Sequence, residues 1–177
     1  MTKIDQTELP AVGTPFGGGF LGAVYFDDDG RRVGLITAPA SSEIEAVFKT
    51  SRTADPGARS LHDGLANSEA MNDAEHPAAQ HCRSLRIGGK DDWQLPSRRD
   101  IYRLAENCMP GAGIVPQQTT AAAFREGGPA AFQRALYWSS TECTSGSAWV
   151  QLFYGGHQYG TGKDWSCRVR AVRKCFL

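Results

Sequence analysis

The sequence has no surplus of charge of either sign. Lysine and arginine total 19, and aspartate and glutamate also total 19, so the formal net charge is zero. Proteins that bind nucleic acid or anionic lipid usually carry a positive surface that attracts phosphate groups. We therefore expect this chain to bind neither nucleic acid nor a membrane surface.

Long apolar runs are also missing. The longest, residues 17–26 and 130–138, are broken by glycine or charge and are too short to cross a bilayer. The first eight residues have no apolar stretch behind a basic start, which a secretory signal requires. We expect no membrane insertion, and a protein that is made in the cytoplasm and stays there unless it leaves as part of a larger particle.

Closely spaced cysteines are absent as well. The five cysteines contain no Cys-x-x-Cys pair and stand far apart, at Cys82, Cys108, Cys143, Cys167 and Cys175. Such spacing does not indicate a disulfide framework, and free cysteine is usually buried as a small apolar side chain. We expect most of these thiols to be buried. A disulfide bond between two of the last three cysteines is the alternative.

The sequence does contain β-rich runs and short helices. Residues 20–26 and 33–36 flank an acidic Asp-Gly turn at 27–30, which predicts a hairpin. Asn67 or Ser68 is suited to cap a short helix that ends near Met71, and Pro77 is suited to open a second one that ends near Leu85. From residue 137 on, short β segments alternate with glycine turns, and one of these segments is 167–172. We expect an α+β fold.

The most distinct helix signal covers residues 97–108. Ser97 is placed to cap the helix, and Asp100 stands three residues further on, where a carboxylate can reach back. Ile101 and Leu104 begin an apolar face. Residues 1–15, in contrast, are a polar lead with two prolines, and we interpret them as an extended arm without a core of its own.

Several stretches, taken in their order and spacing, resemble one family. It is the C-type-lectin-like domain at the C-terminus of the Legionella collagen-like protein, the Lcl family, which is found in many bacterial and phage proteins. The clearest matches are GGKDDWQLPS at 88–97, YWSSTE at 137–142 and RVRAVR at 168–173. Further matches are 18–30, 34–39, 63–67, 78–82 and 148–149, so the resemblance covers nearly everything after residue 15.

The resemblance implies one domain over residues 16–177. In such a fold the N- and C-terminal strands pair, two or three helices flank them, and a long, loop-rich C-terminal region carries recognition. Many of these domains bind protein or carbohydrate without calcium, and in diversity-generating systems lectin-like proteins vary this region on a fixed scaffold. The layout of this chain resembles such a target, but a fold does not by itself identify a ligand.

Six side chains of the C-terminal stretch are the candidate ligand-binding residues. Tyrosine and tryptophan combine a large contact area with a hydrogen-bonding group, and glycine-rich turns tend to lie at the surface. We expect the following six to be exposed and to bind the partner: Tyr154, His157, Gln158, Tyr159, Lys163 and Trp165.

Other large or charged side chains of the matching stretches are expected to serve the structure. Large aromatic residues are mostly buried, so we expect core positions for Trp93, Trp138, Trp149 and Phe153. The arginines at 168, 170 and 173 alternate along the last strand, and a structural ion pair is favoured over anion binding. We expect Glu142 or Asp164 as their partner.

Catalysis and metal binding are the alternatives. Formylglycine-generating enzymes are also C-type-lectin-like and use a close pair of late cysteines, which the widely spaced cysteines here do not reproduce. The 27–30 turn resembles the start of a calcium loop but lacks the distal glutamate. His76, His81 and Cys82 offer at most three zinc ligands at poor spacing. We expect no enzyme activity, no metal and no cofactor.

The sequence thus predicts a non-enzymatic recognition module. We expect a tail-associated virion protein of a phage or prophage that binds a host-surface protein or carbohydrate through the six candidate residues. The N-terminal arm would dock on other virion proteins, and a homo-oligomer is compatible with this role. The alternatives are a structural decoration or assembly protein of the particle and, for its location, the bacterial cytoplasm.

Overall fold

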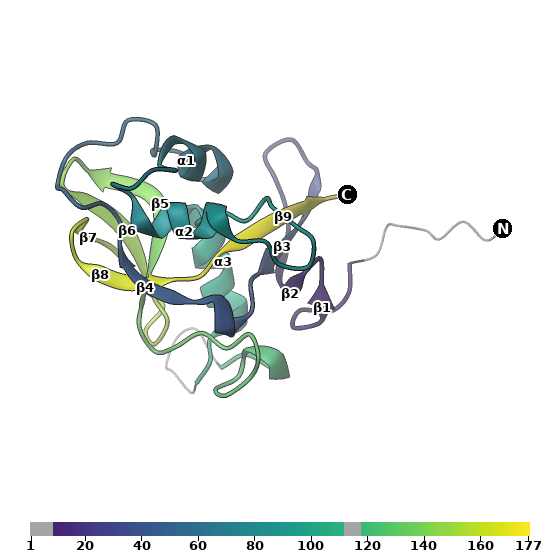
Figure 1. Ribbon diagram of the computed structural model, residues 1–177. Helices are drawn as coiled ribbons and strands as arrows, with labels where there is room; N and C mark the ends of the chain where they lie inside the picture. The colour runs from purple at the N-terminus through teal and green to yellow at the C-terminus, as the bar shows by residue number, and fades with distance from the viewer. Residues whose placement is uncertain (1–8, 112–117) are drawn as a thin grey trace.

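Two β-sheets lie at opposite ends of the molecule, with the helices packed beside and between them (Figure 1). The computed structural model describes residues 9–111 and 118–177. The first sheet has the strand order β1 (Pro15–Phe16), β2 (Gly19–Phe26), β3 (Arg32–Thr37) and β9 (Val172–Phe176). The second has the order β4 (Ile44–Val47), β8 (Ser166–Val169), β5 (Leu136–Thr144), β6 (Ser147–Leu152) and β7 (Gln158–Gly162). The fold is therefore α+β, as expected.

The hairpin of β2 and β3 forms as the sequence predicts. Its acidic turn is stabilised from within, because Asp27 Oδ1 accepts hydrogen bonds from the backbone N–H groups of Asp29 and Arg31 at 3.1 and 2.8 Å. Gly30 takes a φ of 75°, which residues with a side chain rarely adopt. The last strand, β9, pairs antiparallel with β3, so the C-terminus returns to the sheet of the N-terminal hairpin.

Three helices lie in the described part of the chain: α1 (Gly64–Ala70), α2 (Pro77–Ser84) and α3 (Arg98–Cys108). Pro77 opens α2 as predicted. The predicted cap of α1 is wrong, because the helix starts four residues earlier and Asp63 accepts the capping bond from Ala66 N–H. Asn67 and Ser68 instead lie inside the helix, where both are buried. Two short 3₁₀ turns, Ala40–Ser42 and Ala122–Phe124, complete the helical elements.

Helix α3 has the predicted capping box and apolar face. Ser97 Oγ accepts a hydrogen bond from Asp100 N–H at 3.2 Å, and the Asp100 carboxylate accepts one from Ser97 N–H at 3.4 Å. Ile101, Leu104 and Cys108 are fully buried between this helix and the sheets. The helix packs against β6, and its first residue, Arg98, is hydrogen-bonded to Gln158 of β7.

The core has two adjoining clusters. Trp93 and Trp138 are fully buried in the first, as expected, and Trp138 Nε1 donates to Ala46 O at 2.9 Å. In the second cluster, Phe132 stacks on Phe153 with ring centroids 4.1 Å apart. Phe153 is therefore a core residue as predicted, whereas Trp149 is only half-buried.

The single strand expected at 167–172 is in fact two strands in two different sheets. The chain leaves β8 after Val169 and enters β9 at Val172. Between them, the buried Arg170 guanidinium donates to the carbonyls of Ala130 and Ala131 at 3.0 and 2.8 Å. Arg170 thus ties the crossing point to the segment before β5.

The predicted ion-pair partners of the late arginines are wrong. Arg168 and Arg170 both pair with Glu43, at 2.8 and 2.6 Å, and Arg173 pairs with Asp92 at 2.6 Å. Their role is structural, as expected, but the partners lie far away in the sequence.

Residues 9–15 run along the domain. Leu9 and Val12 pack against the two core clusters, and Gly13 N–H donates to Leu21 O at 2.8 Å. The other residues of the predicted arm, 1–8, lie outside the described residues, so the arm's docking role stays a prediction. No helix in the described ranges is long and apolar enough to span a membrane.

Candidate functional site

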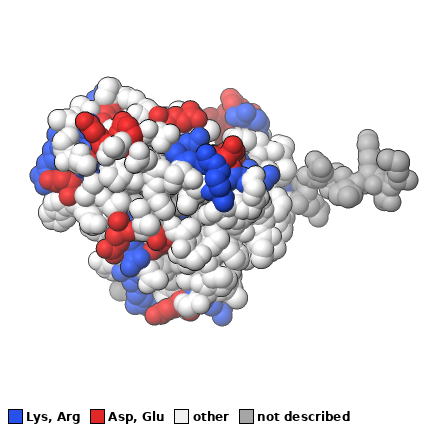
Figure 2. All heavy atoms as spheres, in the orientation of Figure 1, with Lys and Arg blue, Asp and Glu red and all other residues white. Residues whose placement is uncertain are grey.

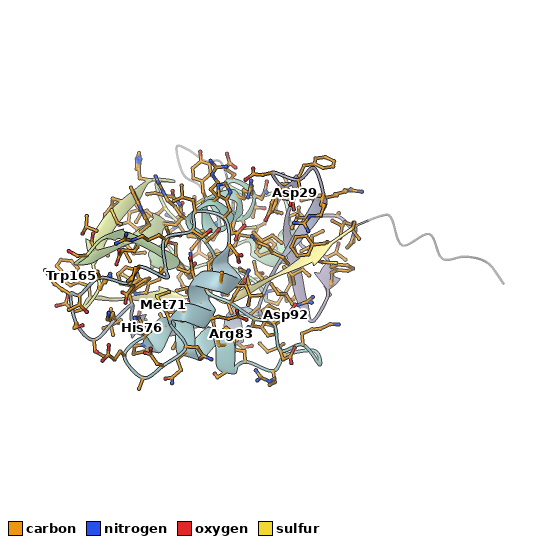
Figure 3. The ribbon with its side chains drawn as sticks, turned by 90° about the horizontal axis from the view of Figure 1, so that it is seen from above. Asp29, Met71, His76, Arg83, Asp92 and Trp165 are labelled. Atoms are coloured by element: carbon orange, nitrogen blue, oxygen red, sulfur yellow. The ribbon has the colours of Figure 1, made fainter. Side chains whose placement is uncertain are left out.

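Three aromatic side chains project from the C-terminal strands. Tyr154 is 53% exposed, Tyr159 is 43% exposed and Trp165 is 59% exposed. Tyr154 follows β6, Tyr159 lies on β7 and Trp165 lies in the turn between β7 and β8. Figure 3 shows Trp165 at one end of the molecule, opposite the acidic turn at Asp29. We call Tyr154, Tyr159 and Trp165 the aromatic surface.

Short turns place the aromatic surface outside the sheet. After β6, the chain reverses through Gly156, which has a φ of 73° and whose N–H donates to Leu152 O at 3.1 Å. In the next turn, Trp165 N–H donates to Gly162 O at 3.0 Å. Partial burial raises the pKa of the Tyr159 hydroxyl, and the nearby Tyr154 and Cys167 add to this rise.

The other three candidate residues have different positions. His157 is exposed, as expected, next to the aromatic surface. Gln158 is half-buried, and its side chain donates to Arg98 O at 2.9 Å while accepting from Arg98 Nε at 3.1 Å. Lys163 was expected at the surface, but its side chain is fully buried. Lys163 cannot contact a partner there, so the ligand-binding role remains a prediction for the exposed residues.

Lys163 is buried because it has three hydrogen-bond acceptors. Its Nζ donates to Thr53 O, Asp55 Oδ2 and Glu142 Oε2, each at 2.7 Å. A buried ammonium group requires such partners, since its desolvation otherwise costs several kcal/mol, on the order of 5. The hydrogen bonds of Lys163 therefore attach the turn that carries Trp165 to the segment after β4 and to β5.

We call Lys163, Asp55 and Glu142, together with the three side chains that extend their contacts, Lys49, His76 and Asp73, the anchoring network. Asp55 Oδ1 accepts from Lys49 Nζ and lies 3.0 Å from His76 Nε2, while His76 Nδ1 lies 2.7 Å from Asp73. Burial acts to raise the pKa of the Asp55 carboxyl, but the hydrogen bonds from Lys163, Lys49 and His76 outweigh it and lower this pKa. In the same way, Lys163 and other donors lower the pKa of Glu142 against the effect of burial.

A hollow of about 490 Å³ lies between α3 and Gln158 of β7. It is lined by Leu61, Arg98, Arg99, Tyr102, Arg103, Glu106 and Gln158. The guanidinium carbon of Arg98 lies 3.6 Å from the centroid of the half-buried Trp149 ring, so this arginine covers part of the ring. The exposed Arg99 gives the rim of the hollow a positive charge that is suited to an acidic group.

The hollow contains residues that the sequence analysis missed. Arg98, Arg99 and Tyr102 were assigned only to the predicted helix. Arg99 and Tyr102 are three residues apart and lie on its solvent side. The adjacent arginines directly after the capping serine were the available signal. Their proximity to Gln158 depends on the packing of α3 against β6 and on the hydrogen bonds between Gln158 and Arg98, which no local pattern reveals.

A second hollow, of about 380 Å³, lies next to the acidic turn, and Arg103 lines both hollows. Several of the aspartates around it are already paired: Asp27 with Arg31 at 2.8 Å and Asp92 with Arg173. In the part of the chain that the structure describes, no three His, Cys, Asp or Glu side chains gather as a metal site. His76 instead joins the anchoring network, and His81 contacts Ser42 O at 2.9 Å.

The cysteines are free thiols in the described structure. Cys82, Cys108 and Cys167 are buried, and Cys143 and Cys175 are half-buried. Burial raises the pKa of the Cys167 thiol to about 11 and also raises the pKa values of Cys82 and Cys108. These three thiols therefore stay protonated at neutral pH.

Charged side chains form small groups of both signs on the face shown in Figure 2. No broad area of one sign covers this face, which agrees with the zero net charge of the sequence. A partner of this face would therefore be selected by local contacts rather than by a long-range field.

A family model described as the Lcl C-terminal domain matches residues 41–173. No curated protein matches the chain. The matched range contains all three helices, the second sheet, the anchoring network and the aromatic surface. The chain belongs to the Lcl C-terminal domain family.

Proposed function

We propose that this chain is a non-enzymatic recognition module that binds a host-surface protein or carbohydrate through the aromatic surface. The observation that carries the proposal is the exposure of Tyr154, Tyr159 and Trp165 on strand β7 and on the two connections that flank it. Large aromatic side chains are usually buried, and exposed ones commonly dominate binding interfaces. Each also offers a polar group beside its apolar ring, which suits protein and sugar surfaces alike.

The anchoring of these turns supports the same proposal. Lys163 fixes the β7–β8 turn through its buried hydrogen bond to Asp55, and Gln158 links β7 to α3 through its hydrogen bond to Arg98. A surface that is already ordered loses less conformational freedom on binding, so more of the contact energy contributes to affinity. The basic hollow beside Gln158 adds a place for an acidic group of the partner.

We further propose that the α+β fold is of the C-type-lectin-like kind. The return of β9 to the sheet of the N-terminal hairpin and the loop-rich region between β5 and β8 support this proposal. The protein would act as a tail-associated component of a phage or prophage virion, docked through residues near its N-terminus. The protonated thiols of Cys82, Cys108 and Cys167 are consistent with a module that has no catalytic cysteine among them.

The proposal is tested by adsorption of the labelled protein to intact bacterial cells and to a glycan array. The variant that combines Tyr154→Ala, Tyr159→Ala and Trp165→Ala should lose adsorption by at least about tenfold, because anchor residues typically contribute 2 kcal/mol or more. Phe26→Ala is the matched control, since Phe26 is 68% exposed at the opposite end. Retained adsorption by the triple variant, with unchanged circular dichroism, would reject the proposal.

A decoration or assembly protein is the alternative role for the same surface. In that case a neighbouring subunit would cover Tyr154, Tyr159 and Trp165 in the assembled particle. Electron microscopy of the particle separates the two roles, because recognition requires the aromatic surface to face outward.

A further inference from the structure

The anchoring network places an amine, a carboxyl and a second carboxyl in mutual contact inside the protein. Lys163 Nζ lies 2.7 Å from both Asp55 Oδ2 and Glu142 Oε2, and all three side chains are at most 8% exposed. The Phe48 ring lies over the amine, with its centroid 5.6 Å away, and shields the group from water. This arrangement brings together a nucleophile, an acyl group and a proton acceptor.

We propose that Lys163 and Asp55 form an intramolecular isopeptide bond, with Glu142 as the proton-transfer residue. A bond forms between Lys163 Nζ and Asp55 Cγ, and the bond from Cγ to Oδ2 breaks. The ammonium group and the carboxylate become an amide and one water molecule, so atoms and charge balance without an oxidant or another reactant. Glu142 begins and ends the reaction as a carboxylate.

The positions of the hydrogen-bond partners fit the steps of this reaction. Lys163 can first pass a proton to Asp55 Oδ2, which leaves a neutral amine beside a neutral carboxylic acid that the amine is able to attack. Attack places negative charge on Asp55 Oδ1, where Lys49 Nζ and His76 Nε2 are positioned to stabilise it. Glu142 Oε2 then takes a proton from the attacking nitrogen and passes it to the protonated Oδ2, which leaves as water.

The proximity of the two reacting groups and the exclusion of water favour formation of the isopeptide bond, whereas the charges of the resting ion pair slow it. Reacting groups that are held in contact behave as if present at very high effective concentration. The hydrogen bonds to Asp55 lower the pKa of its carboxyl, so that the resting pair consists of ions. Bond formation is therefore expected as a single, slow event after folding, and the bonded fraction should rise on incubation.

The closest comparison within the molecule is the pair of Lys174 and Asp100. Lys174 Nζ lies 3.0 Å from Asp100 Oδ2, and this carboxylate is fully buried. The other partner of Lys174 Nζ is the backbone oxygen of His62, at 2.6 Å, and not a second carboxylate. If a proton acceptor beside the amine is required, this pair stays unlinked and serves as an internal control.

The test is the intact mass of the full purified chain, measured in denaturant after incubation. The proposal expects a mass that is lower than the sequence mass by one water molecule. An unchanged mass after prolonged incubation would overturn it. Asp-Gly sequences at 29–30 and 63–64 can also lose water as cyclic imides, so the mass must be followed by peptide mapping. Asp55 itself precedes Pro56, whose nitrogen has no hydrogen and cannot form such an imide.

Tryptic digestion identifies the linked residues. Acylated Lys163 is not cleaved, so the expected product joins peptide 53–59 to peptide 135–168. Lys163→Arg and Glu142→Gln should each restore the sequence mass. A link through Lys49, a link between Lys174 and Asp100, or water loss that persists in Lys163→Arg would each contradict the assignment.

Discussion

Gln158 on β7 and Arg98 at the first turn of α3 hold each other by two reciprocal hydrogen bonds. The Gln158 amide donates to Arg98 O at 2.9 Å and accepts from Arg98 Nε at 3.1 Å. Arg98 N–H in turn donates to Thr141 Oγ1 at 3.0 Å, on β5. A predicted binding residue thus positions the edge strand that carries Tyr159, and it links the aromatic surface to the basic hollow.

Replacing Gln158 by Ala should lower the free energy of unfolding by about 1–2 kcal/mol, because two hydrogen bonds are lost at a half-buried site. Urea denaturation measures this change. Gln133→Ala is the control, since Gln133 is exposed in a loop, and it should leave stability nearly unchanged. Equal stability of the two variants would show that the pair does not hold β7 in place.

Replacing Lys163 by Met should lower the free energy of unfolding further, relative to wild-type protein in which Lys163 and Asp55 are not yet linked. The change keeps a long side chain but leaves the buried carboxylates of Asp55 and Glu142 without their shared cation. Removal of one partner from a buried ion pair typically costs about 3–5 kcal/mol. Urea denaturation checks this value, with the exposed Lys90→Met as the control. A loss below about 1 kcal/mol, the value of an exposed pair, would contradict the burial of this network.

Before the bond between Lys163 and Asp55 forms, acid should destabilise the wild-type protein through the same carboxyls. The pKa values of Asp55 and Glu142 are lower in the folded protein than in the unfolded chain, so both groups stabilise the fold above their ordinary pKa. This contribution should be lost as the pH falls below about 4 and through the lowered values. Unfolding free energies measured from neutral to acidic pH test it, and Lys163→Met should show a weaker dependence. A rise in the unfolding free energy of the wild-type protein on acidification would contradict the predicted direction of this pH dependence.

Replacing Arg99 by Ala should weaken binding to an acidic partner several-fold without loss of stability. Arg99 is exposed at the rim of the hollow, and rim charges mainly affect association rate and salt dependence. Binding rates at low and high salt measure this effect. Arg86→Ala, which removes an exposed arginine outside the hollow, is the control. If both variants bind alike at low salt, the hollow does not contribute to recognition.

Local patterns predicted the elements whose determinants are local. Ser97 and Asp100 stand three residues apart and cap α3, and the glycine of the acidic turn closes the hairpin, so both features were readable from the sequence. The cap of α1 was misplaced because Asn67 is used in a tertiary contact. Its side chain bonds Ser60 and Ser140 from inside the helix.

Burial of charged residues was not predictable in the same way. Lys163 stands between glycine and aspartate in a polar turn, which locally indicates exposure. It is buried because Asp55 and Glu142 reach it from distant segments, and such pairs are set by the topology of the sheets. The same reason explains why Glu43, rather than a nearby acid, pairs with Arg168 and Arg170.

The central claim, that the aromatic surface receives the partner, is tested most directly by hydroxyl-radical footprinting. The protein is oxidised free in solution and while adsorbed to bacterial cells, and the modified residues are read by mass spectrometry. We predict that Tyr154, Tyr159 and Trp165 lose reactivity on adsorption while Phe26 at the far end keeps it. Protection of Phe26 with unchanged reactivity of the three aromatic residues would contradict the account.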